Sequence, residues 1–599
     1  MMEEADNKGR DAIAQLQKEA AERAVINAER AQEEATKGLP PVVPLGFMED
    51  AKTVAYYART RREVVKLKPS EHKAEFLLMM ADISEWASWL FPDKDEEWIE
   101  DHEAKIWKEA RVQLMAAARV AGRFDAEKLR KIGIWEEVVE GKPGLMFNAG
   151  NACFFLPMTG GAPVKVDCLQ ERHIYAADKA MPAPADEPLS YEDGLRLVEY
   201  LSARQWEVAG SGELVAGWIV NSLLAGVAER RPHLWITAPA ETGKTVLHDD
   251  VAAILGDTAV LLEGASTSEA GMRQKLAGYA RPVLFDELEG DGVDNKKIED
   301  GALKIMRTAY ASEAGAITKG GEDGTPREYP VRCGVMCFSV LPALEKATDK
   351  SRCLNLRMVP LPMDKRREIW ASQEEGRSMV TQDDFTGRLI HRVMVEWQHI
   401  RENIKTLREH LKDELGARRA ELIAHLMAGC YALTHGGAVD AAALAHALDV
   451  AQAYEETEEK ACEEMECLAV ILDTLAPYDG IPGKTSARRL CQDVSVGGAE
   501  EKAAADRALA SRGMRWRTDG QERLQIQGSP AHEGIKELLA GTRWASGQIV
   551  RVIGAGCVGS NPNAYGIKVS TAKKPKESKK VCRVILIPAS LIFPEDGEE

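Results

Sequence analysis

The chain has no uninterrupted apolar run long enough to cross a bilayer. Its longest, residues 214–228 (LVAGWIVNSLLAGVA), falls short of the roughly 20 residues that a membrane-spanning helix needs, so we expect a buried helix there. The polar, acidic beginning MMEEADNKGRD does not resemble a secretory signal. Both absences favour a cytoplasmic protein.

Paired cysteines are also missing. The eleven cysteines are scattered, with no CxxC pair and no nearby histidine at the spacing of a metal site. This distribution argues against a disulfide framework or a zinc site and indicates reduced thiols.

Basic residues are too few for a general nucleic-acid coat. The chain contains 77 Lys and Arg against 95 Asp and Glu, which gives a net charge of −18. DNA binding is compatible with this balance only if basic side chains gather in one channel.

The chain is too long for a single hydrophobic core, so we expect several domains. Pro182, Pro184 and Pro188 stiffen a linker, and Ser190 with Asp193 has the pattern of a helix N-cap that opens the next domain. The predicted parts are a charged helical arm (1–40), a mixed α+β domain (42–180), the linker (181–189), an α/β motor (190–361), a helical region (362–468) and a winged-helix-like and β region (469–599).

The arm at 1–40 has two interpretations. Its Ala, Glu, Arg and Gln content with sparse apolar residues favours a solvated helix. A coiled-coil oligomerisation helix is the alternative, although Ile13, Leu16, Ala20 and Val25 form a poor heptad.

Within the motor, short apolar runs have the continuous pattern of strands buried on both faces. They occur at 233–237 (HLWIT), 259–264 (AVLLEG), 282–287 (PVLFDE), 333–339 (CGVMCFS) and 353–358 (CLNLRM). Because helical segments separate most of them, the sequence predicts an α/β fold with a parallel sheet.

A phosphate-binding loop is predicted after the first of these strands. The stretch APAETGKT (238–245) joins the strand to the helical segment VLHDDVAAIL. Amide groups at such a helix start bind phosphate oxygens, Lys244 adds a positive charge, and the Thr245 hydroxyl can hold Mg²⁺. The predicted ATP-binding residues are Thr242, Gly243, Lys244, Thr245 and Val246.

A second part of the ATP site is predicted where the run at 282–287 ends in Asp286 and Glu287. In a nucleotide-hydrolysing site the first carboxylate orients Mg²⁺ and the second polarises the attacking water. The alternative is a buried strand that ends in ordinary surface acids.

Two further residues are candidates for catalysis. Ser339 ends another strand and could contact the γ-phosphate or the water, although serine there is commonly a cap. Arg352 precedes the last strand and could reach a nucleotide across a subunit interface, with Arg357 as the alternative. A surface arginine that pairs with Asp349 is the structural alternative.

Several separated segments together resemble phage and prophage primase-helicase proteins, whose motor is related to superfamily 3 helicases within the AAA+ class. The segments in the motor are 263–290, 302–324 and 329–361, and those ahead of it are 43–58 and 122–155. The resemblance covers most of residues 42–360. It implies a P-loop NTPase core of AAA+ type.

The resemblance also implies a homo-hexameric ring that moves on single-stranded or forked DNA in a bacterial host cytoplasm, using ATP and Mg²⁺. Such helicases carry a hairpin in the ring's pore, and the matching stretch here contains Lys319, with glycines suited to a turn. Lys319 would contact phosphates without reading sequence. A plain surface hairpin is the alternative.

Several departures from the family stand out. Ala238 replaces an opening glycine, which alanine can do only where φ stays below zero. Glu241 introduces negative charge into the loop, and Ser339 stands where many relatives have asparagine. No primase segment is apparent, so a separate primase would supply primers.

The region beyond 469 has the helix and hairpin order of a winged helix. It could bind DNA or another protein, and the sequence leaves both open. The lysine-rich stretch 568–580 is a solvated loop or a DNA grip. The basic residues that favour DNA are Arg488, Arg489, Arg507, Arg512, Arg515 and Arg517.

The sequence therefore predicts an ATP-dependent DNA helicase or translocase of a phage or mobile element. A non-unwinding AAA+ ATPase for origin binding, loading, packaging or defence is the alternative. A degenerate nucleotide-binding scaffold is the third reading, which Ala238 and Glu241 favour and the pair Asp286 and Glu287 opposes.

Overall fold

We analysed a computed structural model of the chain. The structure describes residues 39–48, 50–238, 242–263, 268–286, 293–311, 316–320, 326–339, 344, 347–359, 366–460, 463–518, 522–529, 531–540, 542, 544–545, 548–554, 567–573 and 581–593. The arm expected at 1–40 falls almost entirely outside these ranges. The chain divides into two compact units, one formed by residues 1–131 with 167–179 and the other by the remainder.

The first unit contains a small antiparallel sheet and a group of helices. Its elements are β1 (Val42–Phe47), β2 (Val54–Ala58), β3 (Glu63–Leu67), α2 (Ala74–Leu78), α3 (Ile83–Leu90), α4 (Glu96–Asp101), α5 (Glu103–Ala121), β4 (Leu129–Arg130) and β9 (Ile174–Tyr175). Strand β2 lies between β1 and β3, and its buried side chains share a core with Trp86 of α3 and Ile106 of α5. This unit therefore has its own hydrophobic core.

The 42–180 domain expected from the sequence spans both units. The strands β5 (Gly133–Val139), β6 (Lys142–Asn148), β7 (Cys153–Pro157) and β8 (Val164–Val166) form an antiparallel sheet in the second unit. Ile134 and Leu145 are buried in the same cluster as Leu224, and the Ala280 N–H donates to Ile132 O at 3.0 Å. Their apolar faces are thus buried against the helices and sheet of the motor rather than against the first unit's core.

The second unit is built on a five-stranded parallel sheet, which confirms the α/β expectation. Its strands are β10 (His233–Thr237), β11 (Val260–Glu263), β12 (Val283–Asp286), β15 (Val335–Ser339) and β16 (Cys353–Arg357), in the order β11-β12-β15-β10-β16. All neighbours pair in parallel. Each predicted apolar run supplies one strand, because both faces of a covered parallel sheet are apolar.

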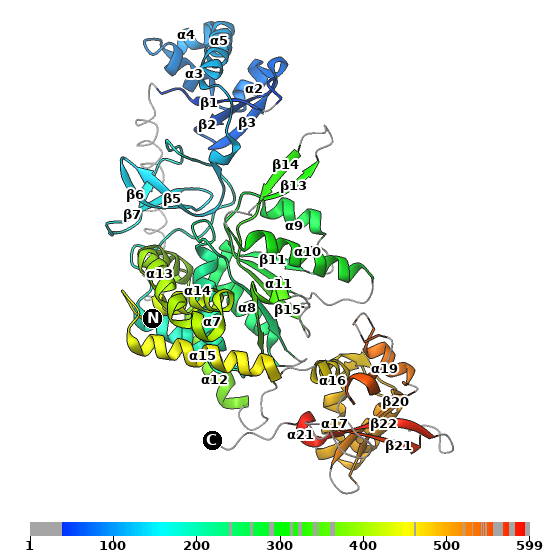
Figure 1. Cartoon of the computed structure of the whole chain (residues 1–599). Coiled ribbons are helices and arrows are strands. Elements are labelled where there is room, and N and C mark those ends of the chain that lie inside the picture. The colour runs from blue at the N-terminus through cyan, green and yellow to red at the C-terminus, as the bar shows by residue number, and fades with distance from the viewer. Residues whose placement is uncertain are drawn as a thin grey trace, which may run out of the picture. The chain divides into compact units, whose positions relative to one another are not determined.

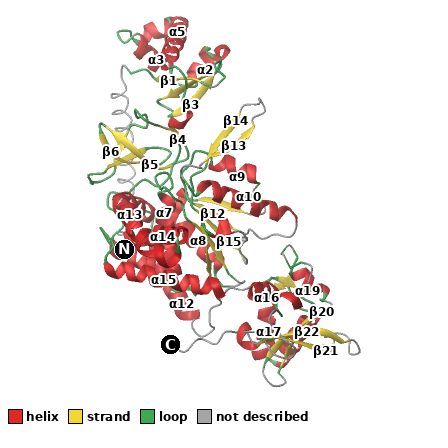
Figure 2. Ribbon diagram, in the orientation of Figure 1, coloured by secondary structure: helices red, strands yellow, loops and turns green. Residues whose placement is uncertain are grey.

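Helices cover both faces of this sheet (Figure 1 and Figure 2). On one face, Leu234 and Leu284 pack in a cluster with Val251 of α8 (Lys244–Leu255). On the other, Trp235 and Phe285 pack with side chains of α9 (Glu269–Leu276) and α10 (Val293–Ala309). Since side chains alternate along a strand, these clusters show which face each strand residue occupies.

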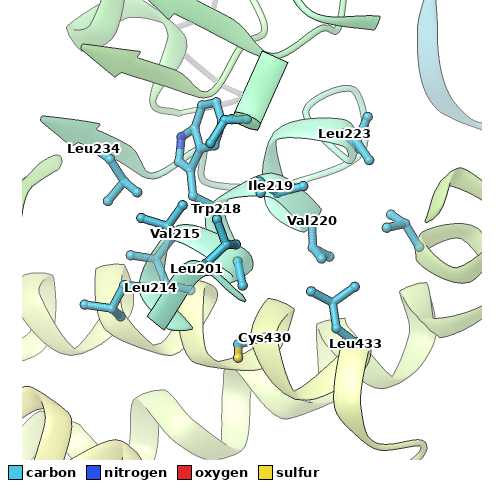
Figure 3. Close-up of a cluster of buried hydrophobic side chains, with 14 of the residues drawn as sticks. Leu201, Leu214, Val215, Trp218, Ile219, Val220, Leu223, Leu234, Cys430 and Leu433 are labelled. Carbon is cyan, nitrogen blue, oxygen red and sulfur yellow. The ribbon is translucent and has the colours of Figure 1, made fainter. Parts of the chain in front are cut away.

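A helical bundle extends the α8 side of the core. It contains α6 (Tyr191–Ser202), α7 (Ser211–Leu223), α12 (Arg366–Val380), α13 (Phe385–Leu415), α14 (Ala417–Thr434) and α15 (Ala441–Lys460). As the sequence predicts, the Ser190 hydroxyl caps α6 by accepting from the Asp193 N–H at 3.0 Å. The apolar run from Leu214 to Leu223 is buried throughout as α7 (Figure 3).

Helices α7 and α14 approach each other closely. A Cβ atom at Gly217 would lie 1.8 Å from Leu426 O, so only glycine permits this crossing. The Asn221 amide nitrogen then donates to both Gly217 O and His425 O, at 2.8 and 2.7 Å. The crossing fixes α7 beside the sheet.

The C-terminal region has a separate core. Its elements are α16 (Glu463–Asp473), β17 (Ala476–Pro477), β18 (Lys484–Thr485), α17 (Ala487–Val496), α18 (Ala499–Ser511), β19 (Met514–Arg517), β20 (Arg523–Ser529), α19 (Glu533–Leu538), α20 (Ile549–Val552), β21 (Lys568–Lys573), β22 (Val581–Pro588) and α21 (Ala589–Ile592). Buried residues from 467 to 592 form one cluster. The winged-helix interpretation stays a prediction.

Two of the arginines expected to favour DNA binding have internal roles. Arg488 forms a two-point ion pair with Asp473, at 2.6 and 3.0 Å. Arg512 is buried and donates to Pro477 O and Gly534 O. Among the described helices of the whole chain, none is long and apolar enough to span a membrane.

We expect Gly217→Ala to lower the free energy of unfolding by about 1–3 kcal/mol, because the added methyl group overpacks the α7–α14 crossing. Chemical denaturation measures the change. Gly271→Ala in α9 is the control, since a Cβ there meets only Ser268 Oγ at 3.4 Å. Equal stability of the two variants would contradict the packing argument.

Candidate functional site

The predicted phosphate loop follows β10, and α8 begins at Lys244. Gly243 adopts the left-handed conformation, with φ of 88°, and caps the helix. Lys244 is half-buried, whereas Thr245 and Val246 are exposed at the first turn. The amide groups of such a turn favour an anion. Residues 239–241, including Glu241, lie outside the described ranges.

Ala238 has the negative φ that alanine requires in place of the loop's opening glycine. Its φ is negative, since the described non-glycine residues with positive φ are Ala51, Arg62 and Glu140. Ala238 is buried, and its N–H donates to Ser339 O at 3.2 Å. Alanine therefore causes no backbone strain at this position, and Thr242, which follows the gap, is also buried.

The sheet register brings Asp286, Ser339 and Arg357 to the edge where the phosphate loop begins. Thr237 lies opposite Ser339 on β15 and opposite Arg357 on β16. Phe285 pairs with Cys337, so Asp286 lies one step further toward the same carboxyl edge. Ligands of open α/β sheets bind outside the carboxyl ends of the strands, at the point where the order of the strands reverses.

Asp286 lies on the same sheet face as α8. Leu284, two residues earlier, belongs to the cluster that contains the α8 side chains, whereas Phe285 belongs to the opposite cluster. Alternation therefore places the Asp286 position on the side where α8 begins with Lys244 and Thr245. Glu287 lies outside the described ranges.

Ser339 occupies the opposite face. It is buried, and its Oγ accepts a hydrogen bond from Trp235 Nε1 at 2.6 Å. Trp235 packs with the α9 and α10 cluster. The expected contact of Ser339 with the γ-phosphate stays a prediction.

Arg352 lies at the other end of the sheet from the phosphate loop. Arg357 pairs with Thr237, and Arg352 precedes it by five residues, a distance of about 16 Å along a strand. Arg352 donates to Thr348 O at 2.6 Å and lies over the Tyr310 ring. It therefore projects from the amino edge, far from the loop of its own chain.

The alternative pairing of Arg352 with Asp349 is wrong. Asp349 accepts two hydrogen bonds from Arg307, at 2.6 and 2.7 Å. Within the described residues, no carboxylate lies within ion-pair distance of Arg352. Arg357 is different, because it forms an ion pair with Glu207 at 3.5 Å. Arg352 and Arg357 therefore differ in both their position along the sheet and their partners.

Lys319 lies on β13 (Ala316–Gly320), which pairs with β14 (Pro326–Pro330) in a two-stranded hairpin. Figure 1 shows this hairpin extending past α9. The register places Arg327 directly opposite Lys319. Sequence reasoning missed Arg327, because only strand pairing shows that the two positions share one level.

Sequence reasoning also missed the buried charges behind the loop. Asp250 of α8 is buried, with an Arg204 ion pair at 2.5 Å and Arg377 at 3.6 Å. Thr237 donates to Asn355 Oδ1 at 3.0 Å, and the Asn355 N–H donates to the Tyr454 hydroxyl at 2.9 Å. These contacts join the segment after α6, helix α12 and helix α15 to the elements flanking the loop.

A magnesium site at Thr245 and Asp286 stays a prediction. In the part of the chain that the structure describes, no three His, Cys, Asp or Glu residues converge as metal ligands. Mg²⁺ with a nucleotide commonly uses one or two carboxylates and the phosphates. The hydroxyl of Thr245 and the carboxylate of Asp286 fit that pattern.

Comparisons with known proteins give little. No family model and no curated protein matches the chain. Among solved structures the chain is similar to "SCCmec type IV Cch - active helicase", with 10% identity, a TM-score of 0.39 and coverage of 92% of this chain and 94% of that chain. A likeness at this TM-score is too distant to carry a fold or a function over.

We expect the buried His233, at the start of β10, to make the protein less stable in acid. Burial lowers the pKa of His233 to about 3 from 6.5, with Nε2 donating to Met306 O and Nδ1 accepting from the Val335 N–H. Only the unfolded chain takes up this proton between those values, so stability falls by about 1.4 kcal/mol per pH unit.

The variant His233→Gln tests this dependence, because an amide can keep one donor and one acceptor. Denaturant unfolding at pH values from 7 down to 4 should show a smaller acid loss in the variant. Parallel stability curves for the two proteins would contradict the assignment.

Proposed function

We propose that this protein is an ATP-dependent helicase or translocase that moves on single-stranded or forked DNA during replication of a phage or mobile element. The observation that carries the proposal is the carboxyl edge of the sheet. There, α8 begins at Lys244 beside the strand end that bears Asp286, on the same face. A phosphate-binding helix start next to a carboxylate is the arrangement that nucleotide hydrolysis needs.

In this proposal the chain's residues divide the chemistry of ATP hydrolysis. The helix amides and Lys244 bind the phosphates, and Thr242, Gly243 and Val246 shape the loop. Thr245 and Asp286 would hold Mg²⁺, which neutralises developing charge when bound. Glu287 polarises the attacking water, and Ser339 ends the strand next to β10 at the same edge of the sheet.

The position of Arg352 supports a proposal of assembly. It lies about 16 Å from the level of its own loop, so it can complete only the site of another copy. An arginine supplied in trans stabilises the charge of the transition state and makes hydrolysis depend on oligomers. A homo-hexameric ring in the bacterial cytoplasm is the assembly that the family resemblance implies.

The β13–β14 hairpin is the proposed DNA contact. Lys319 and Arg327 at one level of the hairpin supply two cations, and their repetition around a ring would line a basic pore in an acidic protein. With no primase segment apparent, a separate primase would provide primers.

We expect Lys244→Ala and Glu287→Gln each to lower ATP turnover by roughly 100-fold or more, because one removes a phosphate contact and the other the water-polarising group. Turnover is measured with and without single-stranded DNA. DNA should stimulate the wild type. Undiminished turnover in both variants would exclude this site, and absence of wild-type turnover would favour a nucleotide-binding scaffold.

We expect Lys319→Ala to keep the basal ATPase rate and to lose strand displacement, with a further loss in Lys319→Ala/Arg327→Ala. Each removed phosphate contact should reduce the salt dependence of DNA binding by about one in the log–log slope. Lys304→Ala on α10 is a surface control. Wild-type ATPase without strand displacement would favour a non-unwinding AAA+ ATPase instead.

A further inference from the structure

The turn that carries Arg352 is clamped by a side chain from a distant helix. Helix α11 (Ala347–Lys350) is a single turn, and Asp349 in it is buried. Arg307 near the end of α10 binds both oxygens of the Asp349 carboxylate. The Arg352 N–H donates in turn to Asp349 O at 2.9 Å. Asp349, which Arg307 holds in place, therefore also restrains the backbone of Arg352.

The Arg352 side chain is held by a residue that follows α10 and by a carbonyl oxygen of α11. Its guanidinium lies over the ring of Tyr310, which follows α10, at 5.8 Å from the ring centroid. Its Nη1 donates to Thr348 O. A cation is attracted to the face of an aromatic ring, so this contact restrains the position of the Arg352 guanidinium. Both the backbone and the cation of Arg352 thus depend on the end of α10.

Helix α10 ends at the amino edge of the sheet. It begins seven residues after Asp286 and spans 17 residues, about 25 Å. Its far end is fixed at the amino edge, where Arg231 Nη1 donates to Ala309 O and His233 Nε2 to Met306 O. The end of α10 that carries Arg307 is therefore itself held by two hydrogen bonds.

We propose that the Arg307–Asp349 ion pair is a positioning element, which sets Arg352 for the nucleotide of a neighbouring subunit. The inference rests on the trans role proposed for Arg352. Nothing in the sequence connects these residues, since Arg307 and Asp349 are 42 positions apart.

The test is complementation between full-length variants. Asp349→Asn has an intact loop but a misplaced Arg352, whereas Lys244→Ala has an intact Arg352 but a damaged loop. We expect Asp349→Asn alone to lose ATP turnover by about 100-fold, the cost of a misplaced group. Mixed one to one with Lys244→Ala, it should recover turnover, because some interfaces then combine an intact loop with a correctly placed arginine.

Two control experiments accompany the complementation test. Arg352→Ala mixed with Lys244→Ala tests the trans arginine alone. Asp473→Asn removes the similar two-point pair with Arg488 in the C-terminal region and should leave ATP turnover unchanged. If Asp349→Asn does not fold, Arg307→Gln on the more exposed partner replaces it, with the same expected loss and recovery.

Three outcomes would overturn the inference. Wild-type turnover in Asp349→Asn would show that Arg352 needs no clamp. Loss without recovery, while Arg352→Ala does recover with Lys244→Ala, would show a purely structural role. Failure of Arg352→Ala to lose turnover would remove the trans arginine itself, and with it this inference, while leaving the ATP site assessed by Lys244→Ala intact.

Discussion

The parallel pairing of β10 with β15 and β16 is the constraint on which the rest of the motor depends. It places Thr237 level with Ser339 and Arg357, so that the strand before the loop ends beside its neighbours. A slip of one residue would exchange the two faces of the strand. Trp235 and Leu234 would then point into the wrong clusters, and the loop would leave the face covered by α8.

Behind the loop, buried polar groups fix the helices rather than the chemistry. A buried Asp250 carboxylate without a partner would lower the stability of the fold, and Arg204 supplies the opposite charge. The Asn221 amide and the glycine crossing hold α7 against α14 in a similar way. Several helices thus restrict the position of α8, and the loop immediately precedes this helix.

The two edges of the sheet separate two parts of the proposed reaction. The loop and Asp286 belong to the carboxyl edge, and Arg352 belongs to the amino edge. One chain cannot bring them together, because the strand between them is about 16 Å long. Oligomerisation in the proposal therefore follows from the direction of the strands.

The sequence by itself determined the strands of the parallel sheet and the helix start at Lys244, because apolar runs and a Gly-Lys-Thr ending are local signals. It also set the condition on the φ of Ala238, which the structure meets. Only the tertiary structure decided that 132–166 joins the motor's unit, that Arg488 and Arg512 are internal, and that Asp349 belongs to Arg307. Those outcomes depend on contacts between residues far apart in the chain, which are set by competing burial and pairing energies and leave no periodic pattern in the sequence.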